Sequence, residues 1–143
     1  MSDTVAIAAD HGGFDLKTAL LPELKALGFD VLDLGTGSTD SVDYPDYADA
    51  LASSIAAGRA GCGILICGSG IGMSIAANRN RAVRAALCHD GLSARLARQH
   101  NNANVLVLGG RLIGLETAKD CLRNFFGASF EGGRHARRVA KMS

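Results

Sequence analysis

The ten residues 63–72, GILICGSGIG, join a short apolar run to a glycine-rich turn. The run lacks the alternation of polar and apolar residues seen in half-exposed strands, which predicts a strand buried on both faces of a parallel sheet. Gly68, Gly70 and Gly72 let the backbone turn tightly and approach a ligand closely, and a helix is expected at 71–79. The stretch therefore predicts a strand–turn–helix unit with a thiol, Cys67, where the strand ends.

Four further apolar runs of the same kind lie on either side of this unit, at Thr4–Ala9, Asp30–Leu34, Val83–Cys88 and Asn104–Leu108. Segments with helical spacing separate the five runs. This alternation implies right-handed crossovers and helices on both faces of a parallel sheet. We expect an α/β fold, a three-layer doubly wound (Rossmann-like) five-stranded parallel sheet, with the common strand order 2-1-3-4-5.

The helical segments carry recognisable start and stop signals. The first has a face with helical spacing and ends at Gly28, a position typical of a C-terminal cap; the face consists of Phe14, Lys17, Leu20, Leu24 and Leu27. Because Pro22 lies inside this segment, we expect the helix to kink there or to begin late. The second begins at Asp43-Tyr44-Pro45, where proline suits the first helical position, and ends at Gly58. Two later helices are expected at 91–99 and 114–126.

Length and composition indicate one domain, residues 1–143, with a basic tail at 127–143 that we expect to form a short helix on a partner subunit. The net charge of +1 makes no case for nucleic acid or a membrane as a partner. No apolar run approaches the length of a membrane span, and the first residues do not resemble a secretory signal, so we expect a cytoplasmic protein. The four cysteines show no zinc-type spacing, and disulfides are not expected.

Two loops are expected to meet where ligands bind in such sheets, at the carboxyl ends of strands one and three. One is the glycine-rich turn after Cys67, and the other contains Asp10 and His11 before two glycines. A thiol that faces a helix N-terminus favours its thiolate form, which can act as a base or a nucleophile. Two simpler interpretations stay open: Cys67 as a small buried hydrophobic residue, and Asp10 as a helix cap.

Other candidate residues lie farther along the chain. Arg111 follows the fifth strand, and His100 ends the fourth helix, where the simpler interpretation as a partner of the helix dipole stays open. Arg134 and Arg138 are four residues apart, so a helix would place both guanidinium groups on one face, a pair well suited to a phosphate. We interpret the similar group Cys88-His89-Asp90 as structural, with Asp90 as a helix cap.

Taken together, the ordered motifs resemble ribose-5-phosphate isomerase of the B type, a family that also contains galactose-6-phosphate isomerase subunits. The resemblance extends over nearly the whole chain. It rests on residues 8–13, 41–47, 67–74, 88–90, 100–105 and 132–135.

The resemblance implies an aldose–ketose isomerase of the pentose phosphate pathway that uses no cofactor and no metal and forms an enediolate. Cys67 would be the base, and the N–H groups of Gly68, Ser69, Gly70, Ile71 and Gly72 would stabilise the oxyanion. His100 would open the sugar ring, with Ser69 and Asp10 assisting. The remaining expected contacts to substrate come from Asn101 and Tyr44 for the sugar and from His11, Arg111, Arg134 and Arg138 for the phosphate.

The resemblance also implies a homodimer or homotetramer with active sites shared between subunits. Ribose 5-phosphate and ribulose 5-phosphate are the leading substrates, and six-carbon sugar phosphates such as allose or galactose 6-phosphate are alternatives. Two other classes stay open: a sugar-phosphate-binding module without catalysis, and a thiol redox protein using Cys67, against which the absence of a resolving cysteine at a motif spacing argues.

Overall fold

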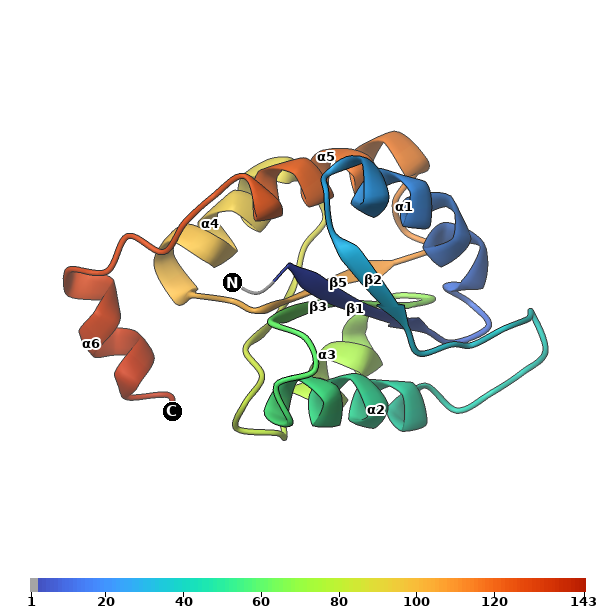
Figure 1. Cartoon of the computed structure of the whole chain (residues 1–143), viewed down its shortest axis with the longest axis horizontal. Coiled ribbons are helices and arrows are strands. Elements are labelled where there is room, and N and C mark those ends of the chain that lie inside the picture. Colours follow the sequence, from blue (N-terminus) through green and yellow to red (C-terminus); the bar gives the residue numbers. More distant parts are fainter. Residues whose placement is uncertain (1–2) are drawn as a thin grey trace.

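The computed structural model describes residues 3–143 and contains a five-stranded parallel sheet with helices on both faces (Figure 1). The strands are β1 (Thr4–Ala9), β2 (Asp30–Asp33), β3 (Cys62–Cys67), β4 (Ala85–Leu87) and β5 (Val105–Gly109). The helices are α1 (Phe14–Ala26), α2 (Tyr44–Ala56), α3 (Ile71–Ala77), α4 (Gly91–Asn101), α5 (Leu115–Phe126) and α6 (Arg134–Ala140). The predicted fold class and the number of strands are confirmed. No helix among these residues is long and apolar enough to cross a membrane.

The strand order is β2-β1-β3-β5-β4, so the predicted order 2-1-3-4-5 is wrong at its last two positions. The chain passes from β3 to the edge strand β4 and then returns to place β5 between them. Because crossovers are right-handed, a step back toward β3 requires the connecting helix to lie on the α1 face of the sheet. α4 lies on that face, beside α1 and α5 (Figure 1).

Burial in the two strands agrees with this order. All five residues of β5 are buried, as in a central strand, whereas the three residues of β4 are partly exposed, as in an edge strand. β4 is also shorter than the predicted run 83–88. The reversal of winding stays between β1 and β3, where it was expected, because the two orders agree there.

Two apolar layers enclose the sheet. Alternate residues of β1 and β3 point to opposite faces, so that Ile7 and Ile64 pack with α1, α4 and α5, while Ala8 and Leu65 pack with α2 and α3. The three-layer arrangement of Figure 1 follows directly from this division.

The helix signals were largely correct. α2 has proline in its first turn, and Gly58 follows it with a φ of +76°. α1 begins at Phe14, so it does not begin late despite Pro22 inside it. Leu27 is exposed and is not part of the buried face, because α1 has ended one residue earlier. Asp90 caps α4, accepting a hydrogen bond from the Ser93 N–H at 2.7 Å.

Candidate active site

Three loops at the carboxyl ends of β1, β3 and β5 meet backbone against backbone. The Gly110 N–H donates to the Cys67 carbonyl at 2.8 Å, and the Arg111 N–H donates to the Gly68 carbonyl at 2.9 Å. No side chain fits between them: a Cβ on Gly109 would lie 2.6 Å from the Ser69 carbonyl oxygen. Main-chain contacts therefore set the relative positions of the three loops.

Cys67 ends β3 at the centre of this arrangement. Its side chain is buried, and its sulfur accepts a hydrogen bond from the Gly70 N–H at 3.1 Å. Gly70 reaches this position with a φ of +80°, a conformation that favours glycine, and it caps the N-terminus of α3. An N–H donor and a helix N-terminus beside the sulfur both stabilise negative charge there.

The loop after β1 lies beside Cys67. Asp10 is buried, and its Oδ1 accepts hydrogen bonds from the N–H groups of Gly12 (2.9 Å) and Gly13 (3.2 Å). This carboxylate thus holds the turn before α1 but does not cap the helix. The N-cap residue is Gly13 and α1 has no side-chain cap hydrogen bond, so the interpretation of Asp10 as a helix cap is wrong. His11 is partly buried, and its Nδ1 accepts from the Val42 N–H at 3.2 Å, which ties the loop before α2 to this edge of the sheet.

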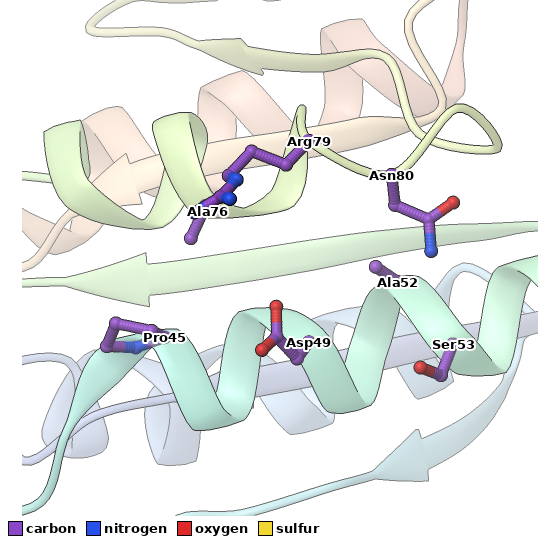
Figure 2. A pocket seen from close by; sticks show the side chains of 7 residues that line it. All are labelled: Pro45, Asp49, Ala52, Ser53, Ala76, Arg79 and Asn80. Atoms are coloured by element: carbon purple, nitrogen blue, oxygen red, sulfur yellow. The ribbon is translucent and has the colours of Figure 1, made fainter.

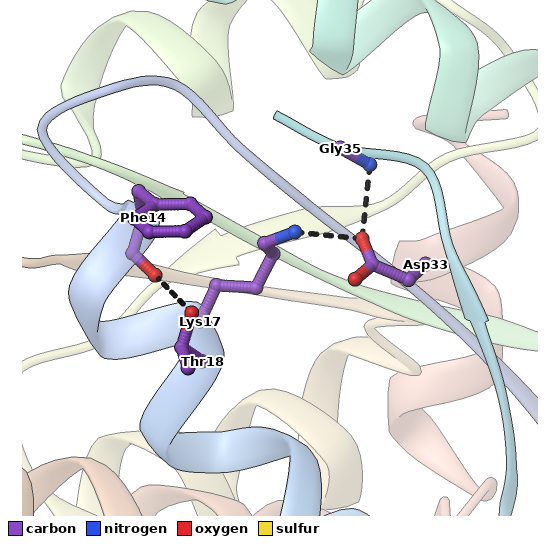
Figure 3. Close-up of polar contacts among 5 residues, drawn as sticks. All are labelled: Phe14, Lys17, Thr18, Asp33 and Gly35. Carbon is purple, nitrogen blue, oxygen red and sulfur yellow. Dashed lines mark hydrogen bonds and ion pairs between the residues drawn. The ribbon is translucent and has the colours of Figure 1, made fainter. Parts of the chain in front are cut away.

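An ion pair between a buried lysine and a partly exposed aspartate holds the start of that same loop. Lys17 on α1 is only 3% exposed, and its Nζ lies 2.7 Å from Asp33 Oδ1 at the end of β2. The same oxygen accepts from the Gly35 N–H, as Figure 3 shows. Gly35 and Thr36 then pair with the Ala9 backbone, next to Asp10. The expected helix face included Lys17, but its partner was not expected.

A pocket of about 650 Å³ opens over the three loops. It collects eight of the expected site residues: Asp10, Tyr44, Cys67, Gly68, Ser69, Ile71, Gly72 and Arg111. The Tyr44 ring packs so closely on Gly72 that a Cβ there would lie 2.4 Å from it. Two apolar residues of the wall, Ile75 and Leu112, were not expected; both are well exposed.

Four expected site residues lie elsewhere: His100, Asn101, Arg134 and Arg138. His100 and Asn101 end α4, next to the residues that begin β5, and therefore lie at the amino ends of the strands. The two arginines lie on α6, which packs beside that end of α4 (Figure 1). A six-residue strand is about 20 Å long, so these side chains cannot reach the pocket of their own chain.

Three further buried cysteines lie outside the pocket. Burial raises the pKa of Cys62 to about 11 and that of Cys121 to about 12. Burial also raises the pKa of Cys88, the thiol of the second candidate group, although a hydrogen bond with Ser93 opposes the change. All three pack in the core layer of α1, α4 and α5, which agrees with the structural interpretation of Cys88.

A second hollow, of about 600 Å³, lies between α2 and α3 (Figure 2). Asp49 and Ser53 line it from α2, and Arg79 and Asn80 line it from the turn after α3. It contains no cysteine or histidine and lies apart from the three loops. It therefore holds neither the thiol nor the imidazole of the expected chemistry.

The comparison with known proteins is specific. The model of the ribose/galactose isomerase family matches residues 5–142. The chain belongs to this family. Ribose-5-phosphate isomerase B of Escherichia coli is 47% identical over 135 residues, which cover 94% of this chain and 91% of that protein. The family membership confirms the class predicted from the sequence, a sugar-phosphate isomerase.

Solved structures of the family have the same fold. A ribose 5-phosphate isomerase from Thermotoga maritima is 54% identical, with a TM-score of 0.94 over 97% of this chain and 96% of that one. Ribose-5-phosphate isomerase B from Mycoplasma genitalium, with bound ribulose-5-phosphate, is 42% identical, with a TM-score of 0.92 over 97% and 93%.

Relatives of similar identity differ in their sugar. A D-erythrulose-4-phosphate isomerase from Pectobacterium atrosepticum is 44% identical over 140 residues, which cover 97% of this chain and 92% of that protein. Membership of the family therefore identifies the class of substrate, a sugar phosphate, and not the individual sugar.

Proposed function

We propose that this chain interconverts ribose 5-phosphate and ribulose 5-phosphate, with Cys67 as the base. The observation that carries the proposal is the Cys67 sulfur, which receives the Gly70 N–H at 3.1 Å beneath a pocket that also contains Asp10, Ser69 and Arg111. The relatives named for ribose 5-phosphate support this choice of sugar, as does the bound ribulose-5-phosphate of the Mycoplasma genitalium protein.

In the proposed reaction, His100 acts as acid or base to open the aldose ring, assisted by Asp10 and Ser69. The Cys67 thiolate then removes the proton from C2, and the carbonyl oxygen on C1 takes up the negative charge, which forms an enediolate. A proton passes from O2 to O1, and Cys67 returns its proton to C1, which leaves the carbonyl at C2. The N–H groups of residues 68–72 stabilise the oxyanion.

The remaining residues hold the substrate. Asn101 and Tyr44 contact the sugar, and the phosphate is bound by His11, Arg111, Arg134 and Arg138. Guanidinium groups suit this role because they donate two parallel hydrogen bonds to one phosphate.

We further propose a homo-oligomer, a dimer or tetramer, in which each pocket is completed by a second copy. This arrangement brings His100, Asn101 and the two arginines of one copy to the Cys67 pocket of another. It is supported by their position at the opposite edge of the sheet from their own pocket. Mixing inactive Cys67→Ala and His100→Ala chains should restore up to about a quarter of the activity if the sites are shared, because a mixed dimer keeps one intact site. A mixture as inactive as its components would contradict sharing.

Solvent isotope exchange tests the base. The protein is incubated in deuterated water with ribose 5-phosphate, allose 6-phosphate, galactose 6-phosphate and erythrose 4-phosphate, and deuterium beside the carbonyl is measured by NMR. Wild type should exchange ribose 5-phosphate fastest, and Cys67→Ala should lose the exchange. Cys88→Ala is the matched control, since Cys88 is also a buried thiol next to a strand end but lies outside the pocket. Equal exchange in wild type and Cys67→Ala would remove Cys67 from its role.

The arginines are tested separately. Replacing Arg134 and Arg138 by alanine should mainly raise KM, whereas Arg137→Ala, on the same helix, should leave KM unchanged. A wild type that binds sugar phosphates but exchanges no deuterium would favour a binding module over an enzyme.

A further inference from the structure

Two histidines and a glutamate form a compact group at the junction of α4 and α6. The imidazole rings of His100 and His135 are stacked, with 4.2 Å between their centroids and 12° between their planes. Glu131 Oε1 lies 3.6 Å from the Nε2 atom of each ring. His135 is nearly buried, whereas His100 keeps 37% of its side chain exposed. The group therefore presents one histidine outward and holds the other against it.

Main-chain contacts fix this group. The Glu131 N–H donates to the carbonyl of Gln99, the residue before His100, at 3.0 Å. The chain then turns at Gly132 and Gly133, with φ values of +68° and +55°, and the His135 N–H donates to the Gly132 carbonyl. The bond to Gln99 thus holds Glu131 at the edge of the His100 ring, and the turn that follows places His135 against the face of that ring.

The arrangement of the two imidazole rings is suited to orienting His100 and not to binding a metal ion. An imidazole lone pair lies in the plane of its ring, so two nearly parallel stacked rings do not direct their lone pairs at one ion. The 3.6 Å separations from Glu131 are also too long for hydrogen bonds, and they indicate a charge interaction with whichever ring carries a proton.

The surrounding charges favour a neutral His135. Burial lowers its pKa, and the positive charges of His100, Arg134 and Arg138 act in the same direction. Glu131 acts in the opposite direction but does not outweigh them. At neutral pH His135 therefore serves as a flat, uncharged surface behind His100.

We propose that His135 and Glu131 are positioning residues for His100, with His135 holding the face of the ring and Glu131 its Nε2 edge. The inference rests on the proposed function, in which His100 opens the sugar ring. Neither residue touches the substrate in this role. Both act by keeping the His100 imidazole in one orientation, so their loss should impair ring opening and leave the proton transfer of Cys67 intact.

The two directions of the reaction separate these steps. Ribose 5-phosphate is cyclic and must be opened before C2 loses its proton. Ribulose 5-phosphate has its C5 oxygen in the phosphate ester, so it cannot close a five-membered ring and is already open. Conversion of the aldose therefore needs His100, whereas exchange of solvent deuterium into C1 of the ketose needs only Cys67.

Both rates are measured for wild type, His135→Ala, His135→Phe and Glu131→Gln, with His89→Ala as a control on an exposed histidine outside the group. We expect His135→Ala to lower kcat for the aldose about tenfold and to leave ketose exchange within about twofold of wild type. His135→Phe keeps a flat ring against His100 and should recover most of the loss. Glu131→Gln should show a smaller loss, again confined to the aldose direction.

The outcomes are decisive. Equal losses in both directions, unchanged aldose conversion in His135→Ala, or a His135→Phe variant as slow as His135→Ala would each overturn the inference alone. A wild type that exchanges deuterium into neither sugar would overturn the proposed function, and the inference with it. Thermal melting of His135→Phe and His135→Ala checks that both variants are folded.

Discussion

Replacing Gly109 by alanine tests whether main-chain contact between loops sets the position of the catalytic machinery. Gly109 pairs in register with Cys67, and a Cβ there would lie 2.6 Å from the Ser69 carbonyl oxygen and 2.8 Å from its carbon. Ordinary Cβ contacts begin near 3.4 Å. The loop that contains Ser69 must therefore move by about 0.8 Å, the difference between 3.4 Å and 2.6 Å.

A misplacement of about 1 Å can cost an enzyme about a hundredfold in rate. We expect Gly109→Ala to lower kcat/KM for ribose 5-phosphate by about 50-fold to 100-fold. The free energy of unfolding should fall by about 1 to 3 kcal/mol, as for other overpacked sites. Both quantities are measured below the melting temperature, by a coupled isomerase assay and by urea denaturation.

Gly114→Ala is the matched control, because a Cβ on Gly114 would have no atom within 4 Å and the residue has no positive φ. It should change neither quantity appreciably. A Gly109→Ala enzyme with activity within about threefold of wild type would refute the reasoning, since a shift of this size should be felt at the reacting atoms.

Three further predictions concern buried charges and thiols. Asp33→Asn leaves Lys17 buried without its counter-charge and should destabilise the protein by about 2 to 4 kcal/mol in urea denaturation, more than Lys17→Met does; equal losses would contradict this. The folded state disfavours protonation of His135, so the unfolded state binds more protons below a pH of about 6.5. The free energy of unfolding should therefore decrease as the pH is lowered through this range. The same titration of His135→Phe should be flatter, and identical curves would be evidence against the effect. At pH 8, iodoacetamide should label Cys67 before Cys121, whose pKa burial raises to about 12, and mass spectrometry of the labelled peptides would reveal the opposite order.

Most of the fold could be predicted from local pattern because the strands are short apolar runs with turns between them. The exchange of β4 and β5 could not be predicted in this way, since it depends on which face α4 covers. That choice is made by packing of residues such as Ala94 and Ala97 against a core built from distant segments. β4 is also only three residues long and partly exposed, so its own sequence says little about its place in the sheet.

The candidate site likewise contains residues whose positions follow from strand topology and residues whose positions depend on tertiary packing. Cys67, Asp10 and Arg111 could be brought together from topology alone, because each lies at or just beyond the carboxyl end of a parallel strand. The stacking of His100 on His135 could not, since it depends on a tail that returns to α4 through the turn at Gly132. In the sequence His135 stands out only as part of the motif at 132–135, and nothing in local spacing indicates that Glu131 lies beside it.

The glycine contacts beneath the pocket have an evolutionary consequence. The surroundings of the Cys67 sulfur are built from main-chain carbonyl and N–H groups, which every residue except proline supplies, so most substitutions elsewhere leave them intact. What α6 contributes depends instead on its side chains, those of Arg134, His135 and Arg138. In the proposed oligomer, substitutions in the tail can therefore change how the substrate is held without changing the main-chain surroundings of the Cys67 sulfur.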